Sequence, residues 1–594
     1  MGQIPWSIST TVRNPERVRN FLKVLKTLEG QTWDYACQEQ FQILLLQNRL
    51  YGAYNNQFYS GLPQKYIDLL ESDKPISFEQ AQEILNSKNY VGGNDMRGRQ
   101  SYNPLKKMGF VYENHKVLRF TDFGNYFLND NYDLGEIFFK SFIKWQLPNP
   151  ASQDFKVGYN IKPFIGTLHL INEVNKLCRK QGVKDKGISK LEFQLFAVTL
   201  FDYRQISSQA KKLLDFRNAY SKSIDKDTFI DNYINSNLAH IDGINNLQDY
   251  ADNAIRYFRL TRYICIRGGY YIDLEPRRQV EIEGLLKFDN ASAHQFNNIN
   301  KYYEYLGDIN APSLPWENLT ENRKIATRIL EEIADYKKQL NETEELVGKK
   351  NLITLNYSQL KDYISYLRTA RQDLQRKIEH NRTQSLQEAE NCRNELKNIY
   401  SSRNKKSIEL ERLCTLALNA LDDAIEIKPN YPVGDDNEPI FTAPGNKPDI
   451  ECYYKDFNAI CEVTMLTDRQ QWFNEGQPVM RHLYDFEITN SGKTGYCLFI
   501  APTMHRDTMN VYWGYRKIGY EGAKQRIVPL TINQFVELLE VLIAKKTKGQ
   551  KLRCDEMRQL YDLVVDSADN CQDAPTWVKS IETILSDWKT KMLS

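Results

Sequence analysis

The sequence predicts a multidomain protein of mixed α+β and α/β character, with a mainly helical N-terminal half, a helical linker and a C-terminal α/β domain built on a mixed sheet. Three observations predict this organisation. The 594 residues exceed the size at which one hydrophobic core stops growing. No proline occurs between Pro315 and Pro429, where long charge-laced helical patterns run. After about residue 400, apolar strand patterns alternate with helical ones.

The composition predicts an intracellular globular protein but does not indicate which kind of partner it binds. Hydrophobic residues make up 41% of the chain, and the net charge of +2 neither demands nor excludes nucleic acid. The 10 cysteines form no C-x-x-C pair and the 7 histidines show no ligand spacing, which argues against structural zinc and disulfides. No apolar run approaches the ~18 residues of a membrane span. We therefore expect a reduced, cytoplasmic protein with no membrane contact.

Residues 101–128 (SYNPLKKMGFVYENHKVLRFTDFGNYFL) predict a helix ending at Gly109, a hairpin, and a second helix capped by Thr121 or Asp122. The predicted hairpin has strands Phe110–Tyr112 and Lys116–Phe120 around the turn formers Glu113 and Asn114.

Residues 253–286 repeat this order, with Gly268 and Gly269 as the hairpin turn and Pro276 in the first turn of a helix. The layout is that of a winged helix, although a pair of ordinary α+β hairpins fits equally well. The basic residues favour DNA binding. They are Arg97, Arg99, Lys106 and Lys107 in the first passage, and Arg256, Arg259, Arg262 and Arg267 in the second.

The proline-free stretch reads as a solvated helical spacer, and the region after it as one helix followed by strands. The strands are predicted near Ile450–Tyr454, Ala459–Thr464, Tyr496–Ala501 and Ile527–Leu530.

The first two of these strands carry the chemistry. If Lys455 and Asp456 form a two-residue turn, Asp449 lies opposite Glu462. Two close carboxylates repel each other unless a cation lies between them, and Mg²⁺ takes carboxylate oxygens together with phosphate oxygens. The pair therefore suits metal-assisted phosphodiester hydrolysis. A Pro-Asp pair followed by Glu-x-Lys is the usual nuclease pattern, and Thr464 here replaces the lysine.

Two further acids could complete this site: Glu411, on the preceding helix, and Glu475. His482 shares a face with Glu475 if the segment is helical, although Pro478 can break the register. On this motif alone, an ordinary hairpin with exposed acids remains an alternative.

Taken together, several passages resemble the AlwI family of type IIS restriction endonucleases, which is related to nicking endonucleases of the PleI and MlyI type. They include WSISTTVRNPERVRNFLKVLKTLEGQTW, RGRQSYNPLKKMGF, FIKWQLPNP, GISKLEFQLF, RYFRLTRYICIRGG, YYEYLGDINAPSLPW, APGNKPDIECYYKDFNAICEVTM, PVMRHL and YCLFIAP. The resemblance covers nearly the whole chain. It implies winged-helix recognition subdomains at 1–150 and 151–304, a helical linker at 305–398, and a PD-(D/E)XK-like cleavage domain at 399–594.

The resemblance also implies the site residues. The family's catalytic acids fall on Glu411, Asp449, Glu462 and Glu475, with His482 as an auxiliary, and Asp449, Glu462 and Glu475 are the implied metal ligands. Relatives also have a threonine at the position of Thr464. The DNA-binding candidates, each of which could instead contact phosphate or form a surface ion pair, are Arg13, Asn14, Arg97, Arg99, Lys106, Lys107, Arg259 and Arg262.

The predicted function is a Mg²⁺-dependent type IIS endonuclease. It would bind a short asymmetric double-stranded DNA site, of the GGATC or GAGTC kind, and cut a few bases to one side. With one active site per chain, a homodimer or a second cleavage subunit would cut the other strand, and the host is expected to have a cognate DNA methyltransferase. The alternative is a sequence-specific DNA-binding regulator whose degenerate nuclease domain serves dimerisation.

Overall fold

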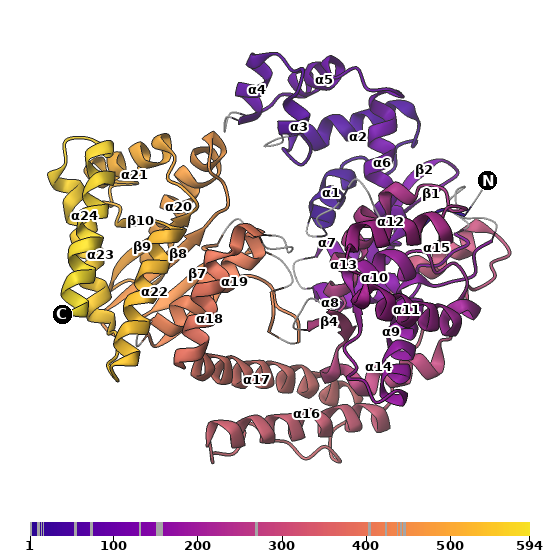
Figure 1. The fold of residues 1–594 in the computed structure, drawn as a ribbon. Helices are drawn as coiled ribbons and strands as arrows, with labels where there is room; N and C mark the ends of the chain where they lie inside the picture. The colour runs from indigo at the N-terminus through magenta and orange to yellow at the C-terminus, as the bar shows by residue number, and fades with distance from the viewer. Residues whose placement is uncertain are drawn as a thin grey trace. The chain divides into compact units, whose positions relative to one another are not determined.

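The computed structural model divides into two compact units (Figure 1). The N-terminal unit comprises Met1–Ile329 and Lys350–Ser365, and the C-terminal unit comprises Leu330–Lys349 and Tyr366–Ser594. The structure describes residues 3–8, 12, 15, 17–52, 56–71, 75–129, 132–149, 158–267, 271–401, 406–421, 424–435, 437–439, 442–443 and 447–594. The fold is mainly helical with one five-stranded mixed sheet, as the sequence predicts.

The N-terminal unit is a helical assembly with two small sheets. Its helices are α1 (Arg17–Lys26), α2 (Tyr35–Gln47), α3 (Asn56–Tyr59), α4 (Gln64–Glu71), α5 (Phe78–Ser87), α6 (Gly93–Lys107), α7 (Asp122–Leu128), α8 (Leu134–Phe142), α9 (Pro163–Lys180), α10 (Lys190–Glu192), α11 (Ile206–Lys222), α12 (Lys226–Asn237), α13 (Leu247–Leu260), α14 (Gln279–Phe288) and α15 (Ile299–Gly307). Its strands are β1 (Val111–Asn114), β2 (Val117–Phe120), β3 (Ile188–Ser189), β4 (Ile264–Arg267) and β5 (Tyr271–Leu274).

The first predicted hairpin is present, but its turn is displaced. Strands β1 and β2 pair antiparallel up to Asn114 opposite Val117. The turn is therefore formed by His115 and Lys116, whose φ angles are 49° and 65°. The prediction of a turn at Glu113 and Asn114 is wrong, because both residues extend β1. The predicted cap is confirmed, since the side chain of Thr121 accepts the N–H of Gly124 at 2.9 Å.

The second hairpin also has the predicted order of elements. Strands β4 and β5 pair antiparallel, and β3 adds to β5. Gly268 and Gly269 lie outside the described residues. Pro276 begins a short 3₁₀ helix that leads into α14, which confirms its place in a first turn. Both passages thus have a helix, a hairpin and a second helix.

The proline-free stretch is helical, as predicted, and both units share it. It holds α16 (Leu319–Leu340), α17 (Tyr357–Thr383) and α18 (Leu386–Lys397). The boundary between the units falls inside α16 and inside α17. Helix α18 buries Ala389, Cys392 and Leu396 in the hydrophobic core of the C-terminal unit.

The C-terminal unit is built on a sheet with strand order β10-β9-β8-β7-β6. The strands are β6 (Glu426–Pro429), β7 (Ile450–Tyr453), β8 (Phe457–Val463), β9 (Thr494–Ala501) and β10 (Ile527–Thr531). Strand β7 pairs antiparallel with both of its neighbours, β6 and β8, whereas β8, β9 and β10 are parallel. Four of the five strands confirm the prediction, and the short edge strand β6 was not predicted.

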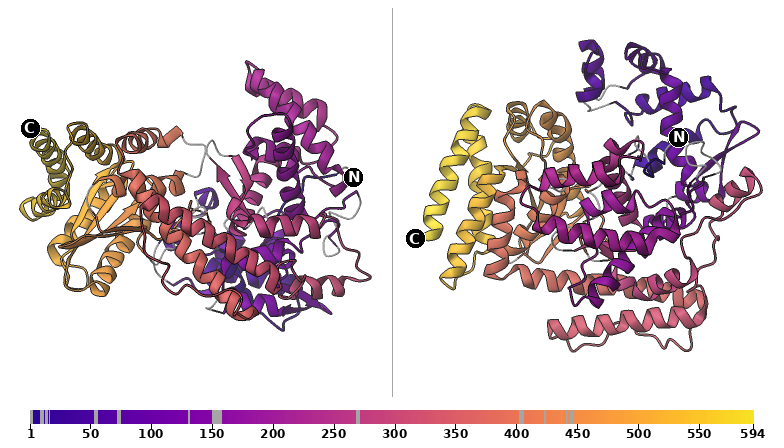
Figure 2. Two further views of the ribbon diagram at one scale, coloured as in Figure 1. Left: turned by 90° about the horizontal axis from the view of Figure 1, so that it is seen from below. Right: turned by 45° about the vertical axis from the view of Figure 1, so that its right-hand side comes forward.

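Helices cover this sheet (Figures 1 and 2). They are α19 (Lys406–Leu421), α20 (Arg469–Thr489), α21 (Arg506–Ile518), α22 (Ile532–Thr547), α23 (Cys554–Asn570) and α24 (Ala574–Leu593). Every residue of β8 is buried, so side chains on both faces of this central strand are covered. No helix among the described residues is long and apolar enough to cross a membrane.

Candidate active site

The β7–β8 hairpin places the two predicted acids opposite each other. The N–H of Tyr454 donates to the carbonyl of Phe457 at 3.2 Å, which closes the predicted two-residue turn. The ladder continues to Ile450 opposite Cys461. Continued by one residue, this register sets Asp449 opposite Glu462, as the sequence predicts.

Helix α20 brings the next two residues to this pair. The helix continues through Pro478, so Glu475 and His482 share one element. Nδ1 of His482 is hydrogen-bonded to Oε1 of Glu462 at 2.8 Å, and both side chains are buried. The hydroxyl of Tyr512 donates to the backbone carbonyl of Glu475 at 3.0 Å.

Burial and mutual repulsion make ionisation of these acids costly. Burial, followed by the charge of Glu462, raises the pKa of Asp449 well above its ordinary value, although the N–H of Val463 donates to its Oδ2 at 2.8 Å. Burial and then the charge of Glu475 raise the pKa of Glu462. Burial raises the pKa of Glu475 to about 7, against the lowering effects of Thr464 and His482. Ionising these acids together is therefore unfavourable unless a cation offsets their charge.

Glu411 adjoins the same group from α19. Its side chain is buried, and its Oε2 accepts the N–H of Ala443 at 2.9 Å. Its charge contributes to the raised pKa of Glu462, so the two carboxylates lie within electrostatic range. We call Glu411, Asp449, Glu462 and Glu475 the acid cluster.

The acid cluster suits a hard divalent cation. Its donors are all carboxylate oxygens, which Mg²⁺ prefers, and a cation there would relieve the repulsion that raises the pKa values. Among the described residues, no three His, Cys, Asp or Glu side chains gather tightly enough to hold a metal ion as they stand. A cation bound here would draw the carboxylates closer and would keep several water ligands, as Mg²⁺ commonly does.

Thr464 does not supply the cation that the usual lysine would. Its N–H donates to the carbonyl of Ile500 at 3.0 Å, and its hydroxyl accepts the N–H of Leu466 at 3.2 Å. A hydrogen bond from its side chain lowers the pKa of Glu475. The residue in the lysine position therefore orients an acid of the cluster, a contact that sequence spacing did not reveal.

Gln471 is a second residue that sequence reasoning missed. Its side chain is fully buried and its Nε2 donates to the carbonyls of Leu466 and Thr503, both at 2.7 Å. Its Oε1 accepts the N–H of His505 at 2.8 Å. These three bonds fasten the start of α20 to the segments that follow β8 and β9, and so position Glu475. In the sequence, the one sign of this positioning role is that Gln471 is a polar residue in a helix that packs on the sheet.

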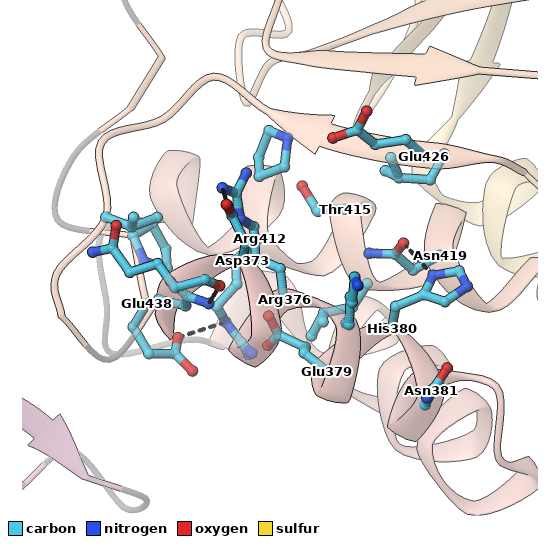
Figure 3. Close-up of a pocket in the computed structure, with 18 of the residues that line it drawn as sticks. Asp373, Arg376, Glu379, His380, Asn381, Arg412, Thr415, Asn419, Glu426 and Glu438 are labelled. Atoms are coloured by element: carbon cyan, nitrogen blue, oxygen red, sulfur yellow. Dashed lines mark hydrogen bonds and ion pairs between the residues drawn. The ribbon is translucent and has the colours of Figure 1, made fainter. Parts of the chain in front are cut away.

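A pocket of about 920 Å³ in the same unit lies between α17, α19 and β6 (Figure 3). None of the four acids of the cluster lines it. Its lining mixes both signs of charge, and several of these groups bond to one another. For example, Nδ1 of His380 is 2.9 Å from Oδ1 of Asn419. The pocket is therefore distinct from the acid cluster.

The predicted DNA-binding residues that the structure describes lie on α6 or in the segment from α13 to β4. Arg13 and Asn14 lie outside the described residues. Three basic side chains form ion pairs inside the N-terminal unit: Lys106 with Glu113, Arg262 with Asp133, and Arg267 with Asp273. Arg256 pairs with Asp252, and Arg97 bonds to Gln100 and lies over the ring of Tyr90. Lys107 and Arg259 are partly buried, whereas Arg99 is exposed.

Comparison with known proteins identifies the family. The family model described as "AlwI restriction endonuclease" matches residues 106–538, which is more than half of the chain. The chain belongs to the AlwI restriction endonuclease family. It is therefore a site-specific deoxyribonuclease and binds DNA. This membership favours the nuclease over the alternative of a non-cleaving regulator.

Two solved structures resemble parts of this family member. The small subunit (R.BspD6I2) of the heterodimeric restriction endonuclease R.BspD6I has 22% identity and a TM-score of 0.28, covering 33% of this chain and 98% of that one. The BpuJ1 endonuclease binding domain, in complex with pyrene- and phenanthrene-modified DNA, has 12% identity and a TM-score of 0.32, covering 52% of this chain and 97% of that one. No curated protein matches the chain.

The raised pKa of Glu475 predicts a pH-dependent stability. A carboxyl group whose pKa rises on folding contributes stability when protonated and loses it as pH rises from about 4.5 to about 7. In chelator, the melting temperature should therefore fall between pH 5 and pH 7.5, and added Mg²⁺ should offset the fall. Glu475→Gln should flatten this dependence. Thermal unfolding followed by circular dichroism tests this, and identical pH profiles for variant and wild type would contradict it.

Proposed function

We propose that this endonuclease binds a short asymmetric double-stranded DNA site, of the GGATC or GAGTC kind, and hydrolyses a phosphodiester bond a few bases to one side in a Mg²⁺-dependent reaction. The observation that carries the cleavage chemistry is the placement of Asp449 opposite Glu462 beside Glu475. Burying several carboxylates close together is costly unless a cation offsets their charge, which favours a cation-binding role for this group. Family membership supplies the class of substrate.

The residues of the cluster would divide the work. Asp449 and Glu462 would hold the cation, and His482 would keep the carboxylate of Glu462 in place through its 2.8 Å contact. Glu475 would either complete the ligand set or accept a proton from the attacking water, and its pKa of about 7 suits a proton acceptor. When bound, the cation supplies positive charge near the scissile phosphate and acidifies water. Glu411 would hold the loop at Ala443 beside the pair.

The chain would cut one strand at a time. The described residues contain one acid cluster, and hydrolysis of two antiparallel strands at separate positions requires two active centres. A second copy of this chain or a separate cleavage subunit would supply the other centre. Recognition is assigned to the N-terminal unit, because the acid cluster lies entirely in the C-terminal unit.

Single substitutions in the cluster should separate cleavage from binding. Asp449→Ala, Glu462→Ala and Glu475→Ala should each reduce cleavage by at least about a thousandfold while specific binding persists, because each removes a proposed cation ligand or proton acceptor. Thr464→Ala should lose only about tenfold, the value of one hydrogen bond to a charged group. Single-turnover cleavage and gel-shift titration measure both properties. The assignment fails if Glu475→Ala cuts normally in folded protein.

The order of strand cleavage tests the proposal of one centre per chain. On supercoiled plasmid with low enzyme, nicked circles should accumulate before linear DNA. If two chains must meet, the linear fraction should then rise faster than in proportion to enzyme concentration. Sequencing the cut ends in the same digests gives the site and the offsets. Linear product that appears without a nicked intermediate at every enzyme concentration would contradict the proposal.

A further inference from the structure

Helix α6 is fixed along one face by close packing. A Cβ atom on Gly98 would lie 1.8 Å from the backbone carbonyl oxygen of Gln38, so α6 crosses α2 at a distance that only glycine permits. One helical turn on, Ser101 donates to the side chain of Gln42 at 3.1 Å. Tyr102 and Leu105 are buried on the same face. The packing therefore fixes which residues of α6 face outward.

The outward face presents two exposed polar side chains four residues apart. Arg99 and Asn103 are exposed, and neither has a hydrogen bond or ion pair within the described part of the chain. Four residues of α-helix span about 6 Å along the axis. This distance is close to that of two base-pair steps of about 3.4 Å each.

Other basic residues near Arg99 are already engaged. The guanidinium of Arg97 bonds to Gln100 and lies over the ring of Tyr90, with a centroid distance of 4.5 Å. Lys106 is paired with Glu113 on β1. Reassigning either residue to a base would break an existing contact, whereas the side chains of Arg99 and Asn103 have no hydrogen-bond or ion-pair partner to lose among the described residues.

The hairpin that follows α6 adds exposed cations. Lys116 lies at its tip and Arg119 on β2, and both are exposed. The backbone of Lys116 accepts the N–H of Trp33 at 2.7 Å, so this tip is held to the body of the unit. Exposed cations of this kind suit the phosphates that flank a groove.

Helix α13, which precedes the second hairpin, lacks an exposed polar face like that of α6. In α13, no residue after Asp249 is exposed. Arg256 is paired with Asp252 on the same helix. The two passages share an order of elements, but the described residues of α13 present no exposed arginine or asparagine comparable with Arg99 and Asn103.

We propose that Arg99 and Asn103 read two base pairs that lie two positions apart in the DNA major groove, with Arg99 on a guanine and Asn103 on an adenine. The pairings follow from chemistry. Guanidinium donates to guanine O6 and N7, and a carboxamide both accepts from adenine N6 and donates to N7. The inference rests on the proposed sequence-specific binding and names the side chains that provide part of it.

Selection from randomised duplexes tests the assignment. The full chain is incubated in EDTA with a pool of random double-stranded DNA, and bound sequences are read. Wild type should select one sequence. Asn103→Ala should lose its preference at a single A·T pair by about tenfold to a hundredfold, and Arg99→Ala at a G·C pair within two positions of it.

Asn218→Ala is the matched control, because Asn218 is also an exposed asparagine on a helix, α11. It should select the wild-type sequence with unchanged stringency. If Asn103→Ala keeps every preference, or weakens binding to all sequences alike, the assignment is overturned and the contact is to phosphate or absent. If wild type itself selects no sequence, the proposed site-specific binding fails instead.

Discussion

The C-terminal unit depends on one costly arrangement, two carboxylates held opposite each other on an antiparallel hairpin. Asp449 and Glu462 are drawn together by the register of β7 and β8, and burial raises the pKa of both. A fold tolerates this repulsion when a cation can offset it. Hydrogen bonds keep the two carboxylates in position. Nδ1 of His482 is bonded to Glu462, and the N–H of Val463 donates to Asp449.

The paired carboxylates also explain why Thr464 can stand in place of the usual lysine. An ammonium group at residue 464 would sit beside the carboxylates and compete with a metal ion for them. Thr464 instead bonds to Glu475, and Gln471 fastens the start of the helix that carries this acid. In the proposed mechanism, the lysine's tasks of neutralising charge and assisting water would pass to a cation and to Glu475.

Much of this structure could be predicted from local sequence patterns, because turns, strand alternation and helix caps depend on residues that are neighbours in the sequence. The hairpin that pairs Asp449 with Glu462 follows from a two-residue turn and strand alternation, and the cap at Thr121 from its side-chain chemistry. Contacts between distant segments were not predictable in this way. The pairing of Arg262 with Asp133, far apart in the sequence, is one that no local pattern could indicate. Strand β6 was missed because four residues ending in proline give almost no pattern.

The central claim is that the acid cluster binds a divalent cation, and Mn²⁺ tests it directly because free Mn²⁺ gives a paramagnetic resonance signal that weakens on binding. Titration of the full chain should show a Mn²⁺ site that Asp449→Asn weakens by at least about tenfold. Glu451→Gln is the matched control, because Glu451 lies on the same hairpin but is already paired with Lys428 at 3.0 Å. The control should bind Mn²⁺ like wild type. Unchanged Mn²⁺ binding by Asp449→Asn would contradict the account.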